Sequence, residues 1–194
     1  MSMNIMKRKL TAFLIVLVSF VFLGALSEKS EFSLDKAKKV EMVLKHVAKK
    51  KRKSPYLRKI SFTQEEINSY LNIFYAKKYA PEVRYIKLKL ERKNHVSGEM
   101  EIKLVGKKYD NVPSFLRDIE VETSGKVECE NYRMRFVFDK LKINGTNFSP
   151  EFLDEAFGAA QVGSKVKKSM FDWFDLLPGL KKVIVDHRKI TIFY

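Results

Sequence analysis

The sequence predicts an α+β domain: a curved, mostly antiparallel sheet wrapped around a long amphipathic helix, preceded by an N-terminal hydrophobic helix. Three observations favour this class. An uncharged apolar run opens the chain, apolar residues then recur at helical spacing on both sides of the middle, and the middle itself alternates with a period of two. We divide the chain into residues 1–27 (leader), 28–59 (basic amphipathic helix and linker) and 60–194 (α+β domain).

The leader begins with Lys7, Arg8 and Lys9 and continues as the uncharged run Leu10 to Ser27. A basic segment followed by an apolar one is typical of a signal peptide or a single membrane anchor. Cleavage after Ser27 would release a secreted or periplasmic protein, and retention would leave a domain anchored in the inner membrane and facing outward. A buried core helix is the alternative to export.

The next segment, Phe32 to Lys53, is predicted to be a helix capped by Ser33, with one apolar stripe and a lysine-rich opposite face. A second helix begins at Thr63, which forms a capping box with Glu66, while Phe62 and Ile67 occupy the positions of a hydrophobic staple. This helix should end at Ala80-Pro81 because proline cannot continue it.

Alternating residues then predict four strands. Two form a hairpin around Lys93-Asn94, and two more meet at Glu130-Asn131. The alternation changes phase at Asp139-Lys140, which predicts a β-bulge. A third helix is expected from Ser149-Pro150 through Leu177, followed by a last hairpin. In that hairpin Val183 and Val185 face Ile190 and Ile192.

Reacting groups are sparse. The three histidines (His46, His95 and His187) lie far apart, without carboxylates or cysteines at ligand spacing, so the sequence predicts no metal, no cofactor and no enzymatic activity. We expect His95 and His187 to be solvated at hairpin turns. The single cysteine, Cys129, cannot form an internal disulfide and is expected to be a buried structural thiol.

Several segments resemble a known family: the helix start Ser61 to Leu71, the Pro81-Glu82-Val83-Arg84 entry to a strand, the Leu141 to Gly145 strand end and the Leu177 to Asp186 exit. Together they are similar to small bacterial envelope proteins of the YpmS and LmeA kind, related to the tubular lipid-binding (TULIP) superfamily. The resemblance covers Ile60 to Tyr194. It implies a curved sheet around a long helix, with an apolar groove that accepts acyl chains.

For these large apolar residues ordinary core packing is the first interpretation, and their excess over what one amphipathic face needs leaves such a groove as the alternative. The candidate lipid-binding residues come from the sheet and the third helix: Met100, Ile102, Phe136, Phe138, Phe152, Phe157, Met170, Phe171 and Phe174.

The chain is strongly basic, with 38 Lys and Arg against 23 Asp and Glu and a net charge of +15. The positive electrostatic potential of so basic a chain attracts phosphate groups. The run Lys49, Lys50, Lys51, Arg52 and Lys53 is the candidate contact with lipid headgroups or a membrane surface, or else a solvated linker.

From the leader, the candidate groove and the basic charge together, we expect non-enzymatic binding or transfer of anionic lipid outside the inner membrane. A structural adaptor that docks an envelope protein through its basic face is the alternative. The predicted export disfavours nucleic acid as a partner.

Overall fold

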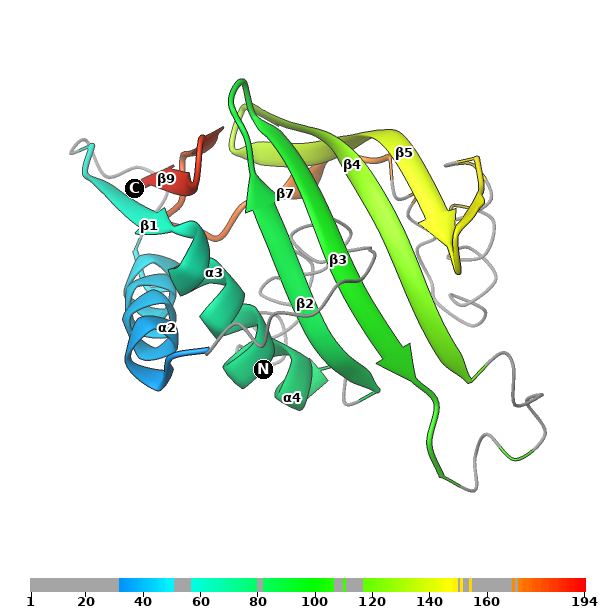
Figure 1. Ribbon diagram of the computed structural model, residues 1–194. Coiled ribbons are helices and arrows are strands. Elements are labelled where there is room, and N and C mark those ends of the chain that lie inside the picture. Colours follow the sequence, from blue (N-terminus) through cyan, green and yellow to red (C-terminus); the bar gives the residue numbers. More distant parts are fainter. Residues whose placement is uncertain are drawn as a thin grey trace, which may run out of the picture.

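The computed structural model describes residues 32–50, 57–79, 82–106, 110, 117–149, 151, 154, 169 and 171–194 (Figure 1). Within these residues the chain is α+β and its sheets are antiparallel, so the predicted class is confirmed. The predicted N-terminal hydrophobic helix lies outside them. No helix among the described residues is long and apolar enough to cross a membrane.

Helix α2 (Leu34–Ala48) forms where the lysine-rich helix is predicted, and the Ser33 side chain accepts a hydrogen bond from the backbone N–H of Lys36. Four residues of its predicted apolar stripe are buried, Ala37, Val40, Leu44 and Val47, and Ala48 is partly buried, whereas Leu34, which was assigned to the same stripe, is exposed. The helix ends earlier than the predicted Lys53. Lys49 is its C-cap, and the Lys49 N–H bonds back to the carbonyl of His46 in a tighter final turn.

The predicted capping box is confirmed at the start of α3 (Gln64–Tyr70). The Glu66 carboxylate accepts from the Thr63 N–H at 2.9 Å, and Thr63 Oγ1 accepts from the Glu66 N–H at 3.2 Å. The helix continues as the π-helical turn η1 (Leu71–Ala76) and the short α4 (Lys77–Tyr79). Strand β1 (Lys59–Thr63) directly precedes α3, and the sequence patterns did not predict it.

The larger sheet is a meander in the order β2-β3-β4-β5-β6. Its strands are β2 (Val83–Leu90), β3 (His95–Lys103), β4 (Asp118–Glu130), β5 (Arg133–Ile143) and the two-residue β6 (Thr146–Asn147). Ser124 lies opposite Lys140 while Gly125 lies opposite Phe138, so Asp139 is the extra residue of a bulge. The predicted phase change at Asp139-Lys140 is thereby confirmed.

The third helix was predicted to run through Leu177, and this is wrong for its C-terminal end. Phe174–Asp175 form strand β7, which pairs with β5 so that Phe174 lies opposite Met134. Pairing with a distant strand overrides the local helical spacing here. The rest of the predicted helix falls almost entirely outside the described residues. The arrangement of a sheet around one long helix is therefore not seen in the part of the chain that the structure describes.

A second sheet has the order β1-β9-β8 and contains the C-terminal hairpin, β8 (Lys182–Asp186) and β9 (Lys189–Phe193). Val183 faces Ile192 and Val185 faces Ile190, as predicted. Where one sheet was expected, the strands thus divide into two. Asn94, in the β2–β3 turn, joins them: its backbone N–H donates to the Val185 carbonyl, and its side-chain oxygen accepts from the Val185 N–H at 2.8 Å.

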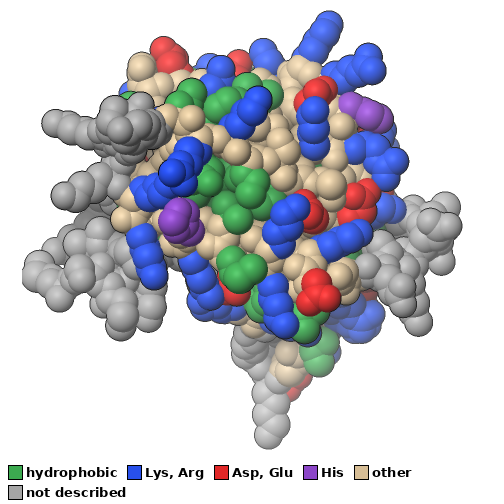
Figure 2. All heavy atoms as spheres, turned by 90° about the vertical axis from the view of Figure 1, so that its left-hand side faces the viewer, with side chains coloured by type: hydrophobic (Ala, Val, Ile, Leu, Met, Phe, Trp, Pro, Cys, Tyr) green, Lys and Arg blue, Asp and Glu red, His purple; other side chains and the backbone are tan. Residues whose placement is uncertain are grey.

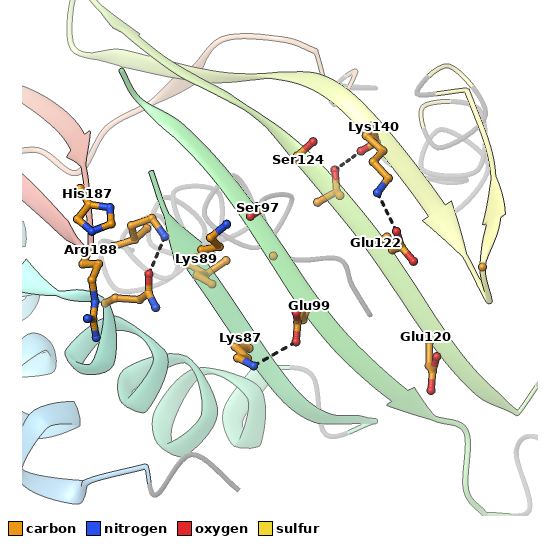
Figure 3. A pocket seen from close by; sticks show the side chains of 16 residues that line it. Lys87, Lys89, Ser97, Glu99, Glu120, Glu122, Ser124, Lys140, His187 and Arg188 are labelled. Carbon is orange, nitrogen blue, oxygen red and sulfur yellow. Dashed lines mark hydrogen bonds and ion pairs between the residues drawn. The ribbon is translucent and has the colours of Figure 1, made fainter. Parts of the chain in front are cut away.

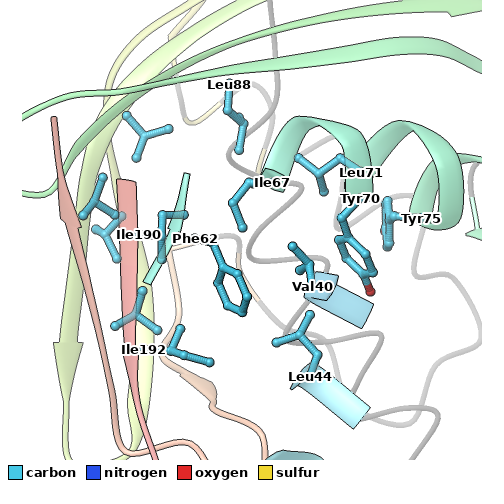
Figure 4. Close-up of a cluster of buried hydrophobic side chains, with 14 of the residues drawn as sticks. Val40, Leu44, Phe62, Ile67, Tyr70, Leu71, Tyr75, Leu88, Ile190 and Ile192 are labelled. Carbon is cyan, nitrogen blue, oxygen red and sulfur yellow. The ribbon is translucent and has the colours of Figure 1, made fainter. Parts of the chain in front are cut away.

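One core holds these layers together (Figure 4). Phe62 of β1 is 1% exposed and lies among side chains of α2, α3 and β9. Because α2 contributes Ala37, Val40, Leu44 and Val47 to this cluster, the basic helix is part of the same folded unit as the sheets. The cluster also includes Val40, Leu44, Ile67, Tyr70, Leu71, Tyr75, Leu88, Ile190 and Ile192.

Side-chain amides of α3 and η1 close the free edge of β2. The Asn68 amide exchanges two hydrogen bonds with the backbone of Leu88, and Asn72 does the same with Ile86. The Gln64 Oε1 accepts from the Leu90 N–H at 2.8 Å. Amides spaced by four residues on one helix thus replace a neighbouring strand, which protects this edge from pairing with another chain.

Candidate functional site

The candidate groove residues that the structure describes lie on one face of the larger sheet and next to it. Met100 of β3, Phe136 of β5 and Phe174 of β7 are buried in the core. Ile102 and Phe138 are partly buried and contact that core. The structure thus brings together residues that are far apart in the sequence, on the apolar face that alternation predicted.

An aromatic row crosses this face. The Phe136 and Phe138 rings have centroids 4.6 Å apart, and Phe138 meets Phe171 edge-on at 5.9 Å. Such edge contacts stabilise aromatic clusters beyond their buried area. Phe171 lies in a turn rather than in the predicted helix. The three remaining candidates, Phe152, Phe157 and Met170, lie outside the described residues.

The space between the two sheets is nearly filled. An apolar cavity of about 20 Å³ remains there, which is room for about one water molecule. Its walls come from both sheets: Leu88, Leu90, Val96, Val127, Met134, Val183, Val185 and Ile190. This part of the interior is ordinary close-packed core and has no room for an acyl chain.

A larger hollow of about 740 Å³ lies on the opposite, polar face of the larger sheet (Figure 3). The sequence placed lysine and glutamate on this face but did not indicate a hollow. Among the labelled side chains, His187 and Arg188 lie at its end beside β2, and Lys140 projects from β5. The other labelled lining residues are Lys87, Lys89, Ser97, Glu99, Glu120, Glu122 and Ser124.

The charges on this polar face are largely compensated. Lys140 and Lys142 both contact one oxygen of Glu122, at 2.8 and 3.0 Å, and their hydrogen bonds hold the pKa of that carboxyl below its ordinary value. Lys87 pairs with Glu99 at 3.5 Å. Cross-strand pairs of this kind stabilise a sheet and leave little net charge for a ligand. Further pairs are Arg84–Glu101, Lys103–Asp118 and Arg135–Glu128.

The outward face of α2 is different. Lys39 pairs with Glu66, and Lys45 with Glu41 at 2.8 Å. Lys36, Lys38 and Lys49 have no ion-pair partner among the described residues. Figure 2 turns this side of the molecule toward the viewer and shows Lys and Arg side chains standing around hydrophobic ones. Two large apolar side chains of the helix are exposed there, Leu34 at 48% and Met42 at 64%.

The predicted headgroup run begins on this helix. Lys49 is exposed, whereas Lys50 is half-buried and holds its ammonium 4.6 Å from the centre of the Tyr194 ring. This cation–π contact attaches the end of α2 to the C-terminal residue. Lys51, Arg52 and Lys53 lie outside the described residues. Sequence reasoning missed Met42, although its exposure could have been read from its position opposite the apolar stripe.

The structure also describes the surroundings of Cys129, His95 and His187. Burial raises the pKa of Cys129, which keeps its thiol protonated at neutral pH. His187 is exposed in the β8–β9 turn, and His95 lies at the start of β3 with Nδ1 3.4 Å from Asp139. Within the described ranges no three His, Cys, Asp or Glu side chains cluster as metal ligands.

No protein-family model matches this chain, and a search of curated proteins finds no match either. The site combines an apolar sheet face that carries an aromatic row, a charge-compensated polar face, and a helix whose Lys36, Lys38 and Lys49 form no ion pair within the described ranges.

Proposed function

We propose that this domain binds anionic membrane lipid on the outer side of the inner membrane and catalyses no reaction. The observation that carries the proposal is the unequal distribution of charge. On the polar sheet face basic groups are matched by carboxylates, whereas α2 presents Lys36, Lys38 and Lys49 without partners among the described residues. Unpaired lysines attract phosphate, and each contributes about 1 kcal/mol near an anionic bilayer.

The hydrophobic run Leu10 to Ser27 supports a location at the membrane, because only six residues separate it from the start of α2. In this proposal the lysines of α2 attract the headgroup. The acyl chains contact the apolar sheet face near Ile102, Phe138 and Phe171, which are only partly buried. Lipid transfer between membranes would use the same two surfaces.

Native mass spectrometry of the gently purified full chain tests the proposal. We expect a copurifying anionic lipid, and uptake of labelled phosphatidylglycerol from liposomes. The variant Phe138→Ser should reduce uptake, whereas Val137→Ser, on the opposite face of the same strand and 38% exposed, should not. A chain that is consistently free of lipid and takes none up would end this proposal.

A structural adaptor of the envelope is the second candidate. The close packing between the two sheets favours it, because the cavity of about 20 Å³ at that place is too small for an acyl chain. In that case the basic face of α2 docks a protein. Crosslinking in intact cells would then recover one dominant protein partner, and its recovery would be insensitive to the anionic lipid content of the membrane.

A further inference from the structure

The outward face of α2 has a specific arrangement around Met42. At 3.6 residues per turn, Met42 lies opposite the buried stripe that includes Val40 and Leu44. It is the most exposed apolar side chain of the helix, at 64%. The neighbours one turn away on either side are all basic types: Lys38, Lys39, Lys45 and His46. An apolar side chain thus stands at the centre of a basic helical surface.

Among the described residues this surface carries more basic than acidic side chains, with Asp35 as the carboxylate on the same face as Met42. Lys38, together with Lys49 two turns beyond Met42, has no ion-pair partner among the described residues. The carboxylates Glu41 and Glu66 neutralise Lys45 and Lys39, on either side of this ridge. The ridge Lys38–Met42–Lys49 therefore combines positive charge at both ends with an apolar side chain between them. A bilayer surface offers the complementary pattern, because anionic phosphates lie above an apolar layer.

The length of the preceding chain limits where this ridge can lie. Six residues separate Ser27, the end of the hydrophobic run, from Leu34, the start of α2. An extended chain covers at most about 3.6 Å per residue, so the start of α2 is no more than about 25 Å from the end of a membrane-embedded run. The helix itself is about 22 Å long. The connecting segment is thus short enough to keep the start of α2, and with it the outward face of the helix, close to the bilayer surface.

We propose that α2 lies along the outer surface of the anionic membrane through the ridge Lys38–Met42–Lys49, with Met42 and the exposed Leu34 entering the interface. The inference rests on the proposed lipid-binding function and adds the orientation of the domain to it. The buried stripe of α2 stays in the protein core, so docking requires no unfolding of the helix. The tip of the β2–β3 hairpin, with Arg92 and Lys93, lies at the top of Figure 1, whereas α2 lies at the lower left, so this tip serves as the reference site outside the docking face.

A depth measurement tests the orientation. The full chain, carrying Cys129→Ser, is labelled at Met42→Cys with an environment-sensitive fluorophore and reconstituted into vesicles of phosphatidylcholine with or without phosphatidylglycerol. Lipids with a quencher near the headgroup should quench the probe in the anionic vesicles, and high salt should reverse this quenching. A probe at Lys93→Cys should stay unquenched. An unquenched probe at position 42, or equal quenching at both positions, overturns the proposal.

Charge variants supply a second, matched test. Lys38→Gln with Lys49→Gln should lower the ratio of docked to undocked protein about 30-fold, because two lysines are removed from the surface. Arg92→Gln with Lys93→Gln removes the same charge from the hairpin tip and should leave the ratio unchanged. If the two double variants lower the ratio of docked to undocked protein equally, docking depends only on net charge, and the assignment of the α2 face is wrong. Lipid uptake that persists without quenching at position 42 would contradict this orientation while leaving the proposed function intact.

Discussion

Asn68 and Leu88 exchange two hydrogen bonds in which a side chain of α3 takes the place of a strand. Asn68 Nδ2 donates to the Leu88 carbonyl at 3.0 Å, and the Leu88 N–H donates to Asn68 Oδ1 at 2.7 Å. Both residues are buried, so water cannot replace either bond. Gln64 and Asn72, four residues before and after Asn68, bond Leu90 and Ile86 of β2. Together these hydrogen bonds fix how the helical segment packs against the larger sheet.

Replacing Asn68 by Ala should destabilise the domain by about 3 kcal/mol, because it leaves a buried N–H and a buried carbonyl of β2 without partners. Urea denaturation should show a lower midpoint with an unchanged slope. Asn147→Ala, at an exposed position of β6, is the control and should change the midpoint little. A midpoint equally low in both variants would mean that the amide ladder is not the cause.

Gly125→Ala should destabilise the domain by about 2 kcal/mol through overpacking. A Cβ at this position would lie 2.3 Å from the Val137 carbonyl oxygen and 2.4 Å from Cζ of Phe136. Adding Phe136→Leu should relieve the contact with the ring but not the one with the carbonyl, so rescue should be partial. Thermal unfolding of the single and double variants measures this. A fully stable Gly125→Ala protein would contradict the packing described for β4 and β5.

Gly179→Ala should loosen the end of α2. The added Cβ would lie 2.2 Å from the Val47 carbonyl oxygen and 2.7 Å from Cβ of Lys50, so the helix end has to move. Hydrogen exchange should speed up in the last turn of α2 while the β3 and β4 amides keep their protection. Gly145→Ala, in the β5–β6 turn, meets no atoms and is strained only by its φ of +77°. It should leave the exchange of α2 unchanged.

Cys129 should react slowly with thiol reagents in the folded protein, because burial raises its pKa and keeps the nucleophilic thiolate scarce. The raised pKa of Cys129 also makes the free energy of unfolding depend on pH. A raised folded-state pKa contributes stability that is present below the ordinary thiol value and is lost as pH rises above it. Cys129→Ala should therefore flatten the alkaline decline in the unfolding midpoint. An unchanged decline would show that other groups cause it.

Sequence patterns were most accurate where the interaction is local. The capping box joins Thr63 and Glu66 within one turn, and the bulge at Asp139 appears as a change of phase within a single strand. Patterns failed where the partner is distant. Ser61 of β1 faces Thr191 across 130 residues of sequence, so nothing near Ser61 indicates a strand. Phe174 has helical spacing, yet its pairing with Met134 makes it part of a strand.

The amino-acid sequence by itself determined the strand alternation, the helix caps and a net charge of +15, since each depends on the identity of residues that are close together or simply counted. Only the tertiary structure decided which charges are neutralised. Lys140 and Lys142 reach Glu122 because the register of β4 and β5 places them together, while Lys38 and Lys49 form no ion pair among the described residues, although Asp35 lies one turn before Lys38. Electrostatic compensation depends on distances across the fold, and composition does not specify those distances.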